Sequence, residues 1–141
     1  MGGLEVLPLG FLILVTGTLI VVNAWAVIDA KMAVTAASRE AARTFVEAPP
    51  GSADAEAQRA GREALSSYGR SAARLTLSHD AGGDYRRCQR VTFTASYTVP
   101  ALTVPFIGGL GSGLTVRSRH SEIIDPFASR PGLTARSDCV R

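Results

Sequence analysis

Two histidines and two cysteines are the side chains of this sequence best suited to bind a metal ion. They are His79, Cys88, His120 and Cys139. A structural zinc site usually takes two of its four ligands from positions only a few residues apart, and no two of these residues are that close. The cysteines leave a disulfide and a pair of free thiols as alternatives. We expect the disulfide, because both cysteines follow a long apolar segment that would place them outside a membrane.

No group of residues in the sequence assembles an active site. Glu122 and Asp125 are an acid pair near a predicted strand end, but no further group converges on them for general acid–base catalysis. We interpret them as a solvated or salt-bridged edge, and His79 and His120 as surface histidines. The glycine-rich residues 108–111 lack the Lys-Ser/Thr end of a phosphate-binding loop. We therefore expect no enzyme activity, no cofactor and no small-molecule substrate.

An isolated acid, Glu5, stands at the edge of an apolar run, and its position leaves two interpretations. Residues 6–28 contain no charged side chain. Glu5 either rests at a membrane surface or meets the N-terminal amine of a neighbouring subunit. The second interpretation follows because a carboxylate in a low-dielectric medium needs a partner.

The apolar run of 23 residues predicts a membrane-spanning helix. As a helix it would be about 34 Å long, enough to cross the hydrocarbon core while satisfying its own backbone. A cleaved signal is the alternative, since residues 24–26 (AWA) fit a cleavage site, but no Lys or Arg precedes the run. Gly10, Gly17 and Ala24 are seven residues apart and share a face. They predict close helix packing, although glycine is also common in membrane helices.

Residues 27–47 predict that the same helix continues into an amphipathic part. They contain no Pro or Gly and are rich in Ala. Residues at helical spacing form one apolar stripe: Val27, Ala30, Val34, Ala37, Ala41 and Phe45. Charged residues, including Asp29, are expected on the opposite side. Residues 49–51 (PPG) end a rod of about 44 residues and about 65 Å.

The remaining sequence predicts a small α+β head with a second, short helix and a three-stranded antiparallel sheet. Ser52 is a plausible N-cap and Gly69 a helix end. Alternation of apolar and polar residues predicts strands at 75–78, at 91–99 and from residue 114, with one polar face. Residues 104–113 are both apolar and Gly-rich. They fit a loop under the sheet edge or an exposed contact for another subunit.

Three regions follow from this pattern. They are the membrane-spanning helix with its extension (residues 1–50), the head (51–128) and a C-terminal tail (129–141). The formal net charge is +3, but the arginines are spread from Arg39 to Arg141 and mixed with acids. That distribution lacks the basic stripe of a nucleic-acid-binding protein.

Four segments resemble the TadE-like minor pilins (pseudopilins) of tight-adherence, Flp-type pilus systems. The first three lie within the first 47 residues, and the fourth is a weaker, C-terminal match. They are residues 3–8 (GLEVLP), 23–31 (NAWAVIDAK), 36–43 (AASREAAR) and 119–127 (RHSEIIDPF).

The resemblance implies a structural subunit that takes part in pilus assembly and cell adhesion. It implies a single-pass protein of the cytoplasmic membrane, with its N-terminus inside and its head extracytoplasmic. Its partners would be the membrane, other pilin-like subunits and the assembly machinery. A membrane-tethered binding or accessory domain outside any fibre is the alternative function.

The resemblance also implies cleavage by a prepilin peptidase, with Glu5 at the fifth position of the mature chain. The family carries a basic leader ending in Gly before that position, and this sequence shows neither before Met1. Either the start is assigned too late or the chain is not processed, and we expect the late start. The resemblance favours Glu5 as an assembly residue.

Overall fold

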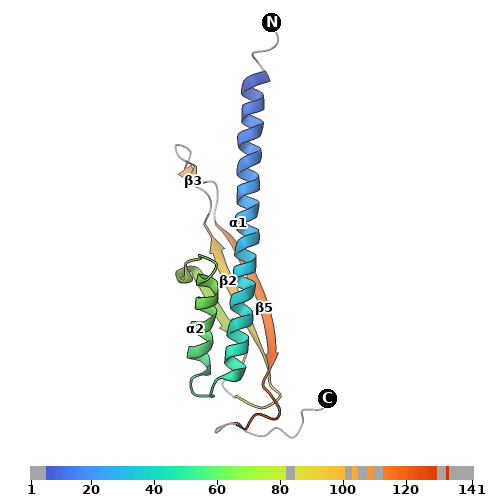
Figure 1. The fold of residues 1–141 in the computed structure, drawn as a ribbon, viewed down its shortest axis with the longest axis vertical. Coiled ribbons are helices and arrows are strands. Elements are labelled where there is room, and N and C mark those ends of the chain that lie inside the picture. The colour runs from blue at the N-terminus through green and yellow to red at the C-terminus, as the bar shows by residue number, and fades with distance from the viewer. Residues whose placement is uncertain are drawn as a thin grey trace.

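The first helix, α1 (Val6–Glu47), runs unbroken for 42 residues. The computed structural model describes residues 6–81, 85–100, 103–104, 108–109, 113–129 and 133. At 1.5 Å per residue α1 is about 63 Å long, so the predicted continuous rod is confirmed. It ends before Pro49 and Pro50, which cannot continue a helix. Figure 1 shows one part of α1 projecting beyond the head and the other part packed along it.

The second helix, α2 (Ala53–Ser66), lies antiparallel to α1 because a connection of only a few residues joins them. Its buried residues are mostly small: Ala53, Ala57, Gly61 and Leu65. Tyr68, which follows the helix, is 42% exposed. Ser52 is the N-cap residue, but its side chain makes no capping hydrogen bond. Gly69 follows the helix with φ +69°, a conformation that glycine adopts without strain.

Three antiparallel strands form the main sheet in the order β1-β2-β5. They are β1 (Leu75–His79), β2 (Arg90–Val99) and β5 (Leu114–Ile123), and a short 3₁₀ helix (Ala72–Arg74) precedes β1. Leu75 pairs with Tyr97, and Tyr97 in turn pairs with Val116. The α+β fold with a long helix, a short helix and this sheet is therefore confirmed.

The connection between β2 and β5 contains a second, very small sheet. In it β3 (Thr103–Val104) pairs with β4 (Gly108–Gly109). These strands could not be predicted, because two residues are too few for a periodic pattern. The rest of the apolar, Gly-rich segment lies largely outside the described residues, so both of its interpretations stay predictions.

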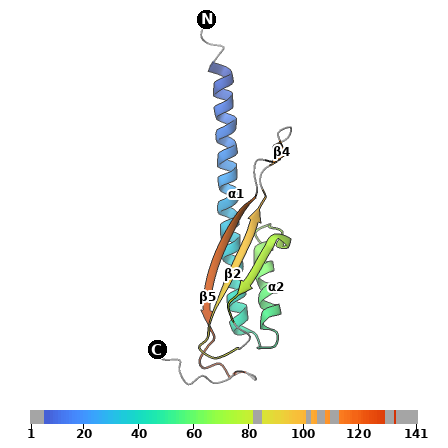
Figure 2. The same cartoon turned by 180° about the vertical axis from the view of Figure 1, so that it is seen from behind.

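The hydrophobic core lies between one face of the sheet and the two helices. Figure 2 shows the strands from the side opposite the helices, with α1 and α2 behind them. The core falls into two clusters. One is built around Val34, Leu65 and Tyr97, and the other around Phe45, Val91, Phe93 and Ile124. Because α1 contributes mainly alanines, its backbone lies close to the sheet and to α2.

Candidate assembly surfaces

The projecting half of α1, defined as residues 6–25, is mostly apolar, and every position in it is exposed. Leu7 is 71% exposed and Phe11 69%. The most apolar 18-residue window of the helix has a mean hydropathy of 2.3 and no buried residue. An apolar surface of this extent marks an interaction site or a membrane segment. By length and composition α1 can cross a membrane, which is compatible with the predicted membrane anchor.

Gly10, Gly17 and Ala24, the predicted packing face, lie on this projecting half. A Cβ atom added at Gly10 or Gly17 would have no neighbour within 4 Å. Beside Gly17 the helix surface has an open apolar groove, lined by Ile13, Leu14, Thr18, Val21 and Val22. The face is thus open in the isolated chain, and its contact with another helix stays a prediction. Glu5 lies outside the described residues, and its role also stays a prediction.

An ion pair ties the head to α1 where the projecting half ends. The Nη2 of Arg70 lies 2.5 Å from Oδ2 of Asp29, and its Nε lies 3.1 Å from the same oxygen. Nη2 also donates to the carbonyl of Ala26 at 3.1 Å. The Arg70 side chain is only 18% exposed, and that of Asp29 is 40% exposed. Nearby, Lys31 Nζ donates to the carbonyl of Arg117 on β5.

Asp29 was expected on the side of α1 opposite the apolar stripe, yet it contacts the head through Arg70. The apolar stripe of α1 predicted which residues pack, but α1 is flanked by both the sheet and the chain that follows α2. Asp29 points to that second neighbour, where Arg70 meets it. The two partners are 41 residues apart in the sequence, so no local sequence pattern predicts the ion pair.

We expect the Asp29–Arg70 pair to couple by about 1 kcal/mol, because it is half-buried and makes two hydrogen bonds to one carboxylate oxygen. A double-mutant cycle with Asp29→Ala and Arg70→Ala, measured by thermal unfolding in detergent micelles, gives the value. The matched pair is Arg43–Glu47, at 3.0 Å but with side chains 68% and 59% exposed. Equal coupling in the two cycles would contradict a special role for Arg70.

At the other end of α1, a tyrosine caps the helix. The Tyr85 hydroxyl lies 2.8 Å from the carbonyl oxygen of Phe45, 3.1 Å from that of Val46 and 3.2 Å from that of Ala48. These carbonyls lie at a helix end, where intrahelical partners run out. Tyr85 thus links the β1–β2 connection to the end of the rod.

His79 belongs to an aromatic cluster, so its assignment as a surface histidine is wrong. Its ring centroid lies 5.2 Å from that of Phe45 and 5.0 Å from that of Phe93. Its Nε2 lies 2.8 Å from Oδ1 of Asp54, and its side chain is 21% exposed. The position after a strand suggested exposure, but β1 carries His79 onto the same face as Leu77, beneath α1 and α2.

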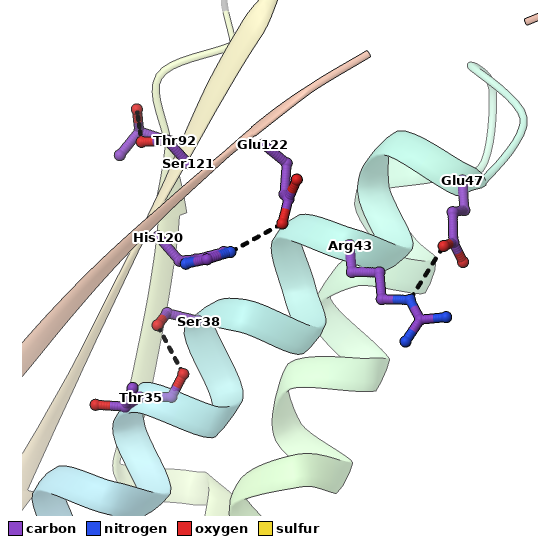
Figure 3. A network of polar contacts seen from close by, with 8 residues as sticks. All are labelled: Thr35, Ser38, Arg43, Glu47, Thr92, His120, Ser121 and Glu122. Carbon is purple, nitrogen blue, oxygen red and sulfur yellow. Dashed lines mark hydrogen bonds and ion pairs between the residues drawn. The ribbon is translucent and has the colours of Figure 1, made fainter. Parts of the chain in front are cut away.

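Glu122 pairs with a histidine rather than with Asp125. Figure 3 shows His120 and Glu122 side by side near α1, and Nε2 of His120 lies 2.9 Å from Oε1 of Glu122. Asp125 instead accepts a hydrogen bond from the N–H of Phe127 at 2.8 Å. Within the described part of the chain, no three His, Cys, Asp or Glu residues gather as a metal site would require.

Cys88 lies in the turn before β2 and is bonded in a disulfide. Its φ of +62° is unusual for a residue other than glycine. Its N–H donates to the carbonyl of Ile124 at 2.9 Å, and the N–H of Ile124 donates to Gln89 at 3.0 Å. These bonds extend the β2–β5 pairing. The second cysteine of the sequence, Cys139, lies outside the described residues, so the Cys88–Cys139 pairing stays a prediction.

The two halves of α1 thus differ in their surroundings. The projecting half is an exposed apolar helix, and the other half is joined to the head by the hydrophobic core, by Arg70 and by Tyr85. Comparison of the chain with protein-family models, with curated proteins and with solved structures found no match.

Proposed function

We propose that this chain is a minor pilin-like subunit that takes part in assembling a tight-adherence pilus. The projecting half of α1 lies in the cytoplasmic membrane, and the head stands on the extracytoplasmic side. One observation carries the proposal: a single unbroken helix is exposed and mostly apolar over residues 6–25 and contributes to the core of the head beyond them. A simple tether has no need of this arrangement, because a flexible linker would hold a head equally well.

A rigid rod fits a subunit whose helix packs among the helices of its neighbours. Gly10, Gly17 and Ala24 would let another helix approach closely. The ion pair of Arg70 with Asp29 fixes the head against the rod, so that packing of the helix sets the position of the head. Glu5 then has the role of meeting the N-terminal amine of an adjacent subunit.

The proposal is tested by Glu5→Leu in the cells that encode the protein. We expect loss of co-purification with other pilin-like subunits and loss of the pilus, with the head still folded. Glu40→Leu is the matched control, because Glu40 is an exposed acid on the packed half of α1. Intact assembly in the Glu5 variant would contradict the assembly role and favour the membrane-tethered accessory domain.

Mass spectrometry of the mature N-terminus provides a second readout. The gene is expressed with its upstream region, and the first residue of the mature chain is measured. Cleavage that places Glu5 at the fifth position supports a processed pilin-like subunit. Cleavage near Ala26 would release the head from the membrane and overturn the proposal.

A further inference from the structure

The sheet face that points away from the helices has an unusual composition. The alternation of exposed and buried residues puts twelve positions of β1, β2 and β5 on this outward face. Eight of them are Ser or Thr, three are Arg90, Arg117 and Arg119, and the last is Ile123. None is an acid. The outward face therefore combines hydroxyl groups with positive charge only.

The arginines of this face are exposed and available. None of the three forms an ion pair with any acid in the described part of the chain. Glu122 lies on the opposite face of β5 and binds His120. Arg117 and Arg119 are two positions apart on one strand, which separates their Cα atoms by about 7 Å.

Asp80 follows β1 directly, and its carboxylate is already engaged. Its Oδ1 accepts the N–H of Thr92 at 2.6 Å. This hydrogen bond holds the pKa of Asp80 below its ordinary value, so the group stays charged but is directed at the backbone. No acid among the described residues therefore neutralises Arg117 or Arg119.

Hydrogen bonds between strands hold several of the hydroxyl groups in place. Thr92 Oγ1 lies 3.0 Å from Ser121 Oγ, and Thr98 Oγ1 lies 3.5 Å from Thr115 Oγ1. Figure 3 shows Thr92 and Ser121 together on the side of the strands away from α1. Short β-branched and hydroxyl side chains lose little entropy when they bind a ligand, unlike long flexible ones. The face is therefore rich in hydrogen-bond donors.

We propose that this outward face binds an acidic polysaccharide, one that carries carboxylate groups along its chain. Guanidinium groups pair with carboxylates through two parallel hydrogen bonds, and the surrounding hydroxyls match those of sugars. The face carries no aromatic side chain, on which the bases of a single-stranded nucleic acid would stack.

The orientation of the strands argues for a glycan rather than for a lipid surface. Figures 1 and 2 show β2 and β5 running alongside α1, so the outward face is roughly parallel to the rod. If the projecting half of α1 crosses a membrane, as the proposed function requires, the plane of that membrane lies across the rod and cannot cover this face.

The test measures binding of polygalacturonate to the full chain in uncharged detergent micelles, by biolayer interferometry at low and at high salt. We expect binding that weakens with salt and that falls about tenfold in the double variant Arg117→Gln/Arg119→Gln. The matched control is Arg39→Gln/Arg59→Gln, which removes the same charge from exposed positions on α1 and α2 and should change the affinity less than about twofold.

Three results would overturn the proposal. They are no binding by the unaltered chain, an equal loss in the two double variants, and tighter binding to anionic phospholipid vesicles or to single-stranded DNA than to polygalacturonate. Neutral dextran should not bind. The measurement needs no pilus, so its failure would leave the proposed assembly function standing, and a normal Glu5→Leu phenotype would leave this result standing.

Discussion

Replacing Phe93 with alanine is expected to lower the free energy of unfolding of the head by about 4 kcal/mol. Phe93 is the largest of the fully buried side chains. Its ring packs against Phe45 of α1, at 5.4 Å between centroids, and against His79 of β1. The substitution leaves a cavity where helix and sheet meet, and the neighbouring alanines of α1 are too short to fill it.

The measurement is urea unfolding in micelles, followed by near-UV circular dichroism, because all three tyrosines of the chain lie in the head. Phe127→Ala is the matched control, since Phe127 is 88% exposed and its loss should cost little. Similar midpoints for the two variants would show that the cluster around Phe93 does not hold α1 to the sheet.

The second large effect is expected at Gly61, a buried residue on the face of α2 that packs against α1. A Cβ atom there would lie 2.6 Å from Cδ1 of Leu77 and 3.2 Å from both the carbonyl oxygen of Ala37 and the Cβ of Ala41. Leu77 can turn its terminal methyl away, but the backbone of α1 cannot move without opening the core. We expect Gly61→Leu to destabilise the head by about 3 kcal/mol through overpacking.

A smaller substitution at the same position separates overpacking from helix propensity. Gly61→Ala gains about 1 kcal/mol of helix propensity, which offsets the tighter contacts, so its unfolding midpoint should stay close to that of the unaltered chain. Ala55→Leu adds a similar bulk on the exposed side of α2 and should be tolerated. A tolerated Gly61→Leu would mean that the two helices are not held at this distance.

The elements with a sustained pattern were predicted well from the sequence. Five alternating pairs of residues defined β2, and the absence of any Pro or Gly between residues 27 and 47 defined the packed half of α1. Both rest on local preferences that the tertiary structure does not oppose. The prediction of a sheet with one polar face followed from the same alternation.

The contacts that fix the head to the rod were not predictable in this way. Arg70 and Asp29 are far apart in the sequence, and Tyr85 reaches the end of α1 from a connection between strands. Such contacts depend on how the chain packs against α1 after α2 and after β1. The periodicity of a single element carries no information on that packing. His79 was misjudged for the same reason, because its burial depends on Phe45 and Phe93.

The shared helix has a mechanical consequence. Between Val6 and Glu47 the helix has no break, so a pull on the head reaches the projecting half through α1 without extending a linker. β2 and β5 run alongside the helix (Figure 2). Tension along α1 therefore acts as a shear force on the core, because it would slide the helix along the sheet. Many contacts, among them those of Phe93 and Val34, must then break together, so the head resists such a pull far better than it would if its strands were peeled apart one by one.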